Sequence, residues 1–183
     1  MPSLISHLAC PACRQPLNKT SNELTCTTCS RTFPILNGIP RFVPKENYAE
    51  SFGLQWNRFA STQIDSKVGT DRSETRFSEE TLWDKNTLNG KLVLDAGCGS
   101  GRFSEIALKF GSALIAVDFS SAVEAAQQNL SAPTKLILQG DLASLPIPNE
   151  TFDYIYCIGV LQHTSEPRPT RLFHRQRNAG TLA

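Results

Sequence analysis

The stretch Val93-Leu-Asp-Ala-Gly-Cys-Gly-Ser-Gly-Arg-Phe103 contains the features that decide the fold. It continues the apolar run Leu92-Val-Leu94, which is typical of a short buried strand. Gly97, Gly99 and Gly101 follow, and apolar residues then recur at helical spacing. A glycine-rich turn between a strand and a helix presents free backbone N–H groups to a ligand, and glycines let that ligand approach closely.

The same order of strand, turn and helix continues along the chain. We expect further strands at Ala113-Leu-Ile-Ala-Val117, Lys135-Leu-Ile-Leu-Gln139 and Phe152-Asp-Tyr-Ile-Tyr-Cys-Ile158. Ser121 and Glu124 have the spacing of a capping box, which predicts that a helix opens there. Nearly continuous apolar strands that alternate with helices predict an α/β fold, with a Rossmann-like parallel sheet of about four strands covered on both faces.

Acidic residues follow the second and third of these strands. Asp118 ends the second strand, where a carboxylate can accept hydrogen bonds from both hydroxyls of a ribose. Asp141 follows the third strand, beside Leu142, and is placed to bind an adenine amino group. The carboxyl ends of the strands form the edge where ligands bind in open α/β sheets. The pattern therefore predicts a nucleoside across this edge.

The glycine spacing distinguishes between two classes of nucleotide cofactor. The nicotinamide fingerprint is G-x-G-x-x-G, whereas here position 102 is arginine and the pattern is D-x-G-x-G-x-G. With Asp118, residues 141–146 and the segment 152–164, this turn resembles the class I S-adenosylmethionine-dependent methyltransferases. The resemblance covers roughly residues 90–166 and is to the methyltransferase type 11 group, which includes ubiquinone and menaquinone biosynthesis enzymes.

The resemblance assigns residues to each part of S-adenosylmethionine. It places Asp95, Gly97, Gly99 and Gly101 around the methionine part, Asp118 at the ribose, Asp141 and Leu142 at the adenine, and Phe119 beside the ring. The alternative is that the glycines only permit tight packing of the helix. Methyl transfer from a sulfonium is an in-line displacement, so alignment and exclusion of water can supply much of the rate. His163 is the candidate general base, with capping of its loop as the alternative role.

Four of the six cysteines form a second pattern near the N-terminus. Cys10-Pro-Ala-Cys13 and Cys26-Thr-Thr-Cys29 are C-x-x-C pairs separated by twelve residues. Four thiolates in two such turns suit tetrahedral zinc, and the intervening residues can form the hairpin that brings the pairs together. A redox or disulfide role is the alternative. We expect Cys98 and Cys157 to be buried thiols rather than nucleophiles.

The segment after the cysteines, residues 33–43, resembles the zinc-ribbon family of small methyltransferase activator proteins. In that family the ribbon is an interaction surface, and a related ribbon begins some ribosomal RNA methyltransferases. The implied partner is therefore a protein or an RNA. Four basic residues of the N-terminal region could contact phosphates: Arg14, Lys19, Arg31 and Arg41. They are few and Glu23 opposes their charge, and such a surface is more often only solvated.

Composition sets the class of protein and the divisions of the chain. The 183 residues are 40% hydrophobic and 19% charged, with a formal net charge of +1, which fits a globular protein without a general field for nucleic acid. The sequence shows neither a signal-peptide pattern nor a long apolar run, so we expect a cytoplasmic protein without membrane contact. We expect a zinc ribbon over 1–45, a linker and N-terminal helical segment over 46–89, and a cofactor-binding domain over 90–183.

The segment before the glycine turn is expected to be helical. Ser78, with Glu79 and Glu80 behind it, is a plausible helix start because acidic groups favour a helix N-terminus. Aromatic residues occur around Trp56, Phe77 and Trp83. We expect them to be core residues, with a contribution to an acceptor site as the alternative.

The end of the sequence limits the functional interpretation. Three further strands expected from the family would need roughly 60 more residues, and 19 follow Thr164. We therefore expect a C-terminally truncated domain that binds its cofactor weakly. The favoured function is methyl transfer to a small molecule or RNA. The alternatives are a zinc-ribbon interaction protein with a vestigial methyltransferase half and, disfavoured by Arg102 and Asp141, a nicotinamide-dependent oxidoreductase.

Overall fold

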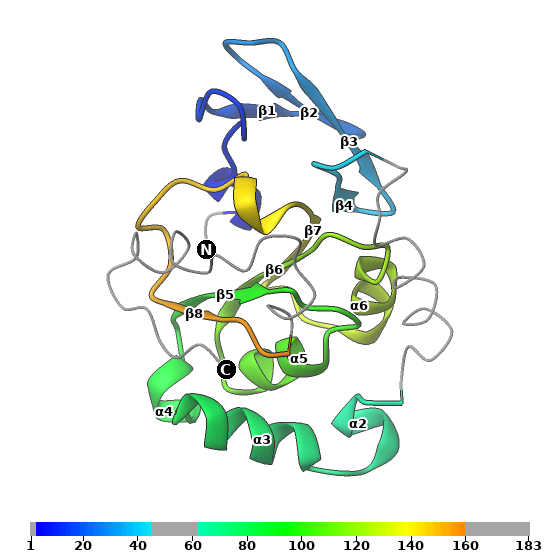
Figure 1. Cartoon of the computed structure of the whole chain (residues 1–183), viewed down its shortest axis with the longest axis vertical. Coiled ribbons are helices and arrows are strands. Elements are labelled where there is room, and N and C mark those ends of the chain that lie inside the picture. The colour runs from blue at the N-terminus through cyan, green and yellow to red at the C-terminus, as the bar shows by residue number, and fades with distance from the viewer. Residues whose placement is uncertain (1–2, 45–61, 160–183) are drawn as a thin grey trace.

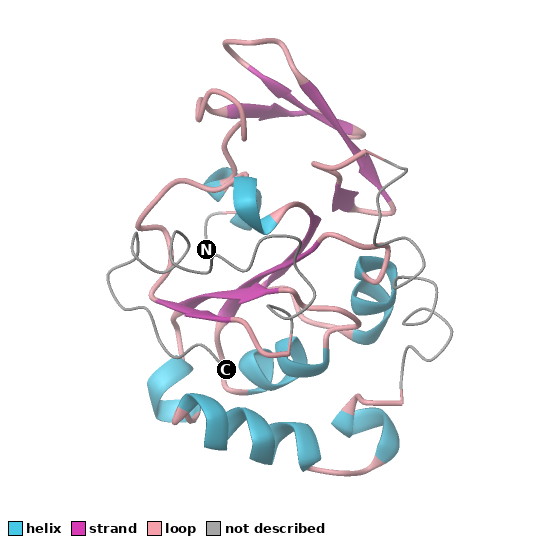
Figure 2. Ribbon diagram, viewed as in Figure 1, coloured by secondary structure: helices cyan, strands magenta, loops and turns pink. Residues whose placement is uncertain are grey.

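The structure is a computed structural model that describes residues 3–44 and 62–159 (Figure 1). These residues form an N-terminal antiparallel sheet and a parallel sheet accompanied by helices (Figure 2). The predicted α/β class is therefore confirmed. The boundary expected near residue 45 and the aromatic residue Trp56 lie outside the described residues.

The N-terminal sheet, here called the ribbon, is built from short strands in the order β1-β2-β3-β4. It consists of η1 Leu4–His7, β1 Leu17–Lys19, β2 Glu23–Cys26, β3 Thr32–Leu36 and β4 Ile39–Pro40. Strands β1 and β2 form the hairpin that was expected between the cysteine pairs, with Leu17 opposite Cys26. Asn37 and Gly38 join β3 to β4 with positive φ angles of 54° and 77°, the conformation that a two-residue hairpin turn requires.

The second sheet has parallel strands in the order β7-β6-β5-β8. It consists of β5 Leu92–Ala96, β6 Ala113–Asp118, β7 Lys135–Gln139 and β8 Tyr154–Tyr156, with α5 Arg102–Lys109 and α6 Val123–Asn129 between strands. The first three strands lie where the apolar runs predicted them. The fourth is shorter than the expected run of residues 152–158.

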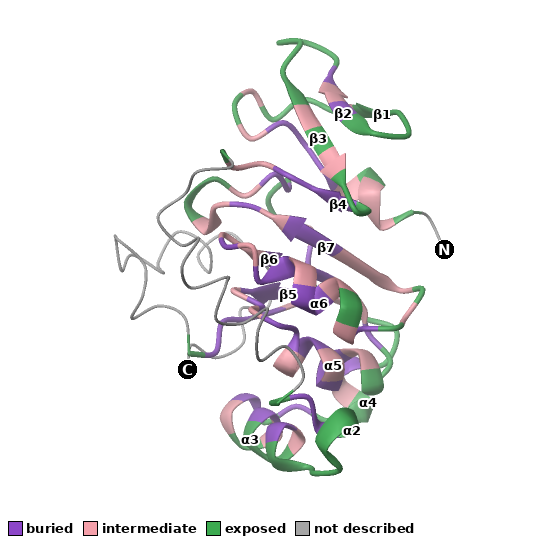
Figure 3. Cartoon of the chain, turned by 90° about the vertical axis from the view of Figure 1, so that its right-hand side faces the viewer, coloured by how far each residue is buried: buried purple, intermediate pink, exposed green. Residues whose placement is uncertain are grey.

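The two faces of the parallel sheet are covered by different parts of the chain (Figure 3). Val93 and Leu114 point to one face, where they pack with residues of the helical layer such as Phe77 and Ile106. Residues from the adjacent positions on the same strands belong to the other core cluster, which includes Leu24 of the ribbon. In the part of the chain that the structure describes, the ribbon therefore covers one face of the sheet.

The described part of the helical segment before β5 contains α2 Asp65–Val68, α3 Arg72–Thr81 and α4 Lys85–Leu88. The helix expected from Ser78 begins earlier, at Arg72. The expected helix start at Ser78 is wrong, because the Asp65 carboxylate accepts hydrogen bonds from Ser73 N at 2.9 Å and Glu74 N at 3.0 Å and so caps α3 at its first turn. Phe77 and Trp83 are buried, as the core interpretation predicted.

Helix α6 opens in the segment where the Ser121 and Glu124 pattern predicted a start. The helix begins at Val123 with Ala122 at its N-cap, and Glu124 N donates a hydrogen bond to Ser121 O at 3.0 Å. The Glu124 carboxylate also pairs with Arg41 of the ribbon. The start of this helix is therefore connected to a distant segment of the chain. None of the helices in residues 3–44 and 62–159 is long and apolar enough to cross a membrane.

Candidate cofactor and metal sites

The glycine turn connects β5 to α5 in a conformation that favours glycine. Gly97, Gly99 and Gly101 have φ angles of 92°, 52° and 92°. Gly97 N and Cys98 N both donate to Val117 O, at 2.7 Å and 3.0 Å. The turn is therefore tied to the carboxyl end of β6, the strand on which Asp118 lies.

Two of the glycines serve different purposes. A Cβ atom at Gly101 would lie 3.1 Å from the Leu130 side chain, so this glycine permits close packing against the end of α6. A Cβ atom at Gly99 would meet nothing within 4 Å. Gly99 therefore supplies its backbone conformation and leaves open space above the turn, which is the geometry that a bound ligand needs.

Asp118 joins the neighbouring turns at this edge of the sheet. Its Oδ2 accepts a hydrogen bond from Gly99 N at 2.9 Å, and its Oδ1 accepts from Ser120 N at 2.8 Å and Ser120 Oγ at 2.7 Å. Gly140 N donates to Asp118 O at 2.9 Å, which brings the segment after β7 alongside. The structure thus brings together the first two predicted parts of the cofactor site.

Asp95 lies beneath the turn rather than at its surface. Only 3% of the residue is exposed, and its Oδ2 accepts hydrogen bonds from Ser104 Oγ at 2.6 Å and Tyr156 Oη at 2.9 Å. Burial raises the pKa of Asp95 to about 7. The charge of Asp118 also raises this pKa, whereas the hydrogen bonds from the two hydroxyls lower it. Any contribution of Asp95 to the methionine site would act from below.

The predicted adenine-binding residues lie after β7. Asp141 is half-buried and caps η2 Leu142–Ser144 by accepting a hydrogen bond from Ala143 N at 2.8 Å. Leu142 packs against the core cluster on the ribbon side of the sheet. Phe119 is half-buried, and its carbonyl accepts a hydrogen bond from Gln139 Nε2 at 3.0 Å. His163 lies outside the described residues, so its role stays a prediction.

The two cysteines of the sheet region are buried, as predicted. Cys98 is 6% exposed and Cys157 is fully buried. Burial, followed by the charges of Asp95 and Asp118, raises the pKa of Cys157 to about 12. A thiol with such a pKa is protonated at neutral pH and is a poor nucleophile.

The four ribbon cysteines converge on one point. Their Sγ atoms all lie within 4.8 Å of one another, with Cys10 and Cys29 3.6 Å apart and Cys13 and Cys26 3.4 Å apart. Zn–S distances of about 2.3 Å in a tetrahedron place the sulfur atoms about 3.8 Å apart. The cluster therefore has the size and the ligand type that suit a metal ion such as zinc.

Backbone N–H groups support one of these thiolates. Cys29 N and Thr28 N each approach Cys26 Sγ at 3.5 Å. These donors lower the pKa of Cys26. A thiolate is the form that binds a metal, so the turn at residues 26–29 favours metal binding.

Ribbon residues hydrogen-bond directly to the predicted adenine-binding segment. Ala9 N donates to Pro146 O at 2.8 Å, and Arg14 Nη1 donates to Leu145 O at 2.7 Å. Arg14 follows Cys13, one of the cluster cysteines, in the sequence. The cysteine cluster and the segment after Asp141 are therefore connected by short polar contacts.

A second connection runs from β4 to the end of β7. Arg41 is 8% exposed, pairs with Glu124 and donates from Nη1 to Gln139 Oε1 at 3.1 Å. Gln139 in turn donates to the Phe119 carbonyl, and Phe42 N donates to Gln139 O at 2.8 Å. Arg41 is thus committed to the interface with the sheet and is not part of an exposed basic face.

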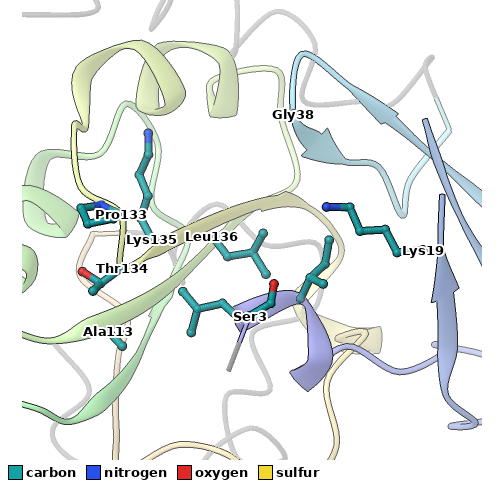
Figure 4. A pocket seen from close by; sticks show the side chains of 10 residues that line it. Ser3, Lys19, Gly38, Ala113, Pro133, Thr134, Lys135 and Leu136 are labelled. Carbon is teal, nitrogen blue, oxygen red and sulfur yellow. The ribbon is translucent and has the colours of Figure 1, made fainter. Parts of the chain in front are cut away.

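A pocket of about 280 Å³ lies at the opposite end of the strands (Figure 4). It lies between η1, the ribbon and the starts of β6 and β7, and Lys19 and Leu136 are among its lining residues. The Lys135 side chain leads away from it toward α6, where Nζ donates to Gln127 O at 3.1 Å. None of the predicted cofactor residues lines this pocket.

Sequence reasoning missed Ser104, Tyr156 and Gln139. Their side chains donate hydrogen bonds to the Asp95 carboxylate and to the Phe119 carbonyl. A tyrosine in an otherwise apolar strand and a serine on the buried side of α5 were the available signals. The partner of Tyr156 could not be named, because Tyr156 and Asp95 are 61 residues apart in the sequence.

Comparison with known proteins gives two separate family matches. Residues 94–177 match the methyltransferase domain family, and residues 2–38 match the family of Trm112p-like proteins. The chain joins a methyltransferase domain to a Trm112p-like module. Both predicted resemblances are therefore confirmed.

Individual relatives match parts of the chain. The mitochondrial ubiquinone biosynthesis O-methyltransferase of Schizosaccharomyces pombe is 35% identical over 98 residues, which are 50% of this chain and 35% of that protein. The malonyl-[acyl-carrier protein] O-methyltransferase of Yersinia pestis is 30% identical over 128 residues, 69% of this chain and 44% of that protein. The chain thus spans less than half the length of these two curated relatives.

Among solved structures, the crystal structure of magnesium protoporphyrin IX methyltransferase from Synechocystis PCC 6803 with bound SAH is similar at 26% identity. The TM-score is 0.48, and the match covers 64% of this chain and 57% of that one.

Proposed function

We propose that this chain binds S-adenosylmethionine at the carboxyl ends of β5, β6 and β7 and transfers its methyl group to an acceptor. The observation that carries the proposal is the Asp118 carboxylate, which is hydrogen-bonded to Gly99 N beside the open space above that glycine. A carboxylate accepts about four hydrogen bonds. The three backbone and hydroxyl donors described above therefore leave it able to accept from a ribose hydroxyl.

The cofactor supplies a methyl group activated by a positively charged sulfur. The protein has to bind it, align it with the acceptor and exclude water, because in-line displacement needs no covalent intermediate. In this proposal the backbone of the glycine turn binds the methionine part, and Asp141 and Leu142 bind the adenine. His163 remains the candidate base for an acceptor that must lose a proton.

We propose an oxygen atom of a small molecule as the acceptor. The two curated relatives described above are both named O-methyltransferases, which supports an oxygen acceptor, and the relative named for ubiquinone biosynthesis supports a small molecule. The contacts of the ribbon point in the same direction. Arg41 is buried and Arg14 donates to a backbone carbonyl, so two of the four basic residues considered for RNA contact have partners within the chain.

We further propose that the four cysteines hold zinc and that the ribbon steadies the cofactor site. Cys10, Cys13, Cys26 and Cys29 would be its ligands, and zinc would fix the two turns that carry them. The polar contacts at Pro146, Leu145 and Gln139 then attach this fixed module to both segments expected to surround the nucleoside.

Binding of S-adenosylhomocysteine measured by isothermal titration calorimetry tests the cofactor proposal. Removing the ribose partner in Asp118→Ala should weaken binding about a hundredfold, because hydrogen bonds to a charged group are at stake. Asp84→Ala is the matched control, since Asp84 caps α4 and lies outside the site. Circular dichroism establishes that both variants are folded.

The outcomes separate the two functions considered. Saturable binding by the wild type that is lost in Asp118→Ala supports a working cofactor site. Absence of binding by the folded, metal-loaded wild type contradicts the proposal and favours the alternative, a ribbon-based interaction protein with a vestigial methyltransferase half.

A further inference from the structure

Three structural elements meet at a single oxygen atom under the glycine turn. Oδ2 of Asp95, at the end of β5, accepts from Ser104 in the first turn of α5 and from Tyr156 on β8. Ser104 and Tyr156 are fully buried. A buried hydroxyl without a partner is costly, so both hydroxyls hold the carboxylate in a fixed place.

The aromatic packing around Tyr156 fixes the position of its hydroxyl. The ring packs edge-on against Phe77 of α3, with centroids 5.1 Å apart, and lies 6.4 Å from Trp83. Because these neighbours are themselves buried, Tyr156 has little freedom to turn away. The β8 strand and the helical layer together therefore determine where the Asp95 carboxylate lies.

Asp95 is the residue of this cluster that changes charge near neutral pH, because the thiols and the phenol that face it stay protonated there. Burial and the nearby charges raise the pKa of Cys98 and of Tyr156 well above their usual values. The pKa of Cys157 is raised to about 12, and Asp118 contributes a second negative charge from β6. A cation placed beside this cluster favours the ionised form of Asp95.

We propose that Ser104 and Tyr156 are positioning residues for the methyl donor: their hydroxyls hold the Asp95 carboxylate under the turn, where its ionised form attracts the sulfonium cation. This inference rests on the proposed function. Asp95 needs no direct contact with the cofactor, because a charge buried at low dielectric acts over several ångströms. The buried network therefore favours the charged donor over the demethylated product, which has a neutral sulfur.

The difference between two ligands isolates this effect. S-adenosylmethionine and S-adenosylhomocysteine share the amino and carboxylate groups and differ in the charge on sulfur. Calorimetric affinities of both ligands for the full chain between pH 6 and pH 8.5 should show that affinity for S-adenosylmethionine rises with pH through the pKa of Asp95. Affinity for S-adenosylhomocysteine should change less.

Tyr156→Phe removes one hydroxyl and keeps the ring. We expect the pKa of Asp95 to rise by about 1, because a hydrogen bond to the charged form is lost. Affinity for S-adenosylmethionine should then fall about fivefold at pH 7 and recover at pH 8.5, whereas that for S-adenosylhomocysteine stays within about twofold. Tyr154→Phe is the matched control on the same strand, since among the described residues no hydrogen bond joins Tyr154 to Asp95, and its pH profile should equal that of the wild type.

Ser104→Ala, which removes the other donor, should shift the pH profile in the same direction and serves in place of Tyr156→Phe if that variant fails to fold. Equal pH dependence for both ligands in the wild type, or an unshifted profile in a folded Tyr156→Phe, would overturn the inference while leaving cofactor binding established. Failure of the wild type to bind either ligand would instead contradict the proposed function.

Discussion

The ribbon and the parallel sheet are stabilised in opposite ways. Strands β5 and β6 are buried along nearly their whole length, and Leu94, Leu114 and Ile115 are fully inaccessible to solvent. Strand β3 of the ribbon alternates between exposed and half-buried residues, and β1 contains no buried residue. The sheet can therefore depend on apolar burial, whereas the ribbon has too little of it and needs another source of order.

The ribbon has two such sources, the cysteine cluster and its interface with the sheet. The cluster fixes residues at both ends of the ribbon's hairpin, and Leu8, Leu24 and Ile39 extend into the cores beneath. A small module can thus be ordered by a metal and a partner surface where its own core is insufficient. The difference between the regions can be tested by perturbing each in turn.

The largest effect is expected from loss of a metal ligand. Cys26→Ser removes the thiolate whose pKa is lowered by backbone donors, and metal binding contributes about 10 kcal/mol to the folding of small zinc modules. We expect metal content to fall to background and amides in β1 and β2 to lose protection from hydrogen exchange, while those of β5 and β6 stay protected.

Cys98→Ala is the control for this experiment, because Cys98 is a cysteine outside the cluster. It should leave metal content and ribbon protection unchanged. Retention of bound metal and of ribbon protection in Cys26→Ser would show that apolar packing alone orders the ribbon, and the contrast between the two regions would then disappear.

A core truncation should have the reverse pattern. Leu114 is fully buried in the centre of β6, and replacing it with alanine should reduce the free energy of unfolding by about 3 kcal/mol through lost burial and a cavity. Denaturant titration followed by circular dichroism measures this loss. Leu36→Ala in the ribbon, at a position 43% exposed, should cost less than about 0.5 kcal/mol. Equal losses at the two positions would contradict the comparison.

Local patterns made the sheet and the cysteine cluster predictable. The apolar run of residues 135–139 corresponds to the bounds of β7, and the spacing within each C-x-x-C pair already limits how far apart its sulfur atoms can lie. The glycine turn was predictable for the same reason, since Gly97 and Gly101 adopt φ angles that few other residues tolerate. In each case a short segment contains all the information that determines its structure.

Contacts between distant segments explain the failures. The Glu124 carboxylate binds Arg41, 83 residues earlier, and no local pattern predicts this pair. The start of α3 depends on Asp65 of α2, whose carboxylate accepts hydrogen bonds from Ser73 N and Glu74 N. Likewise, Asp95 accepts a hydrogen bond from Tyr156, which no spacing rule relates to the glycine turn. The candidate site was thus predictable in its turns and not in the network that supports them.

The smallest effect is expected at the joint between the two regions. Arg41→Met keeps the apolar stem but breaks the ion pair with Glu124 and the hydrogen bond to Gln139. We expect a loss of about 2 kcal/mol, less than for a fully buried pair, because the Glu124 side chain is 30% exposed and regains water. Arg31→Met, at an exposed ribbon position, should not change the stability.

Hydrogen exchange of Arg41→Met should show the extra opening in β4 and β7. The affinity of Arg41→Met for S-adenosylhomocysteine should also fall, since Gln139 binds the Phe119 carbonyl. Unchanged affinity with a loosened β4 would show that the ribbon is attached to the sheet without steadying the cofactor site.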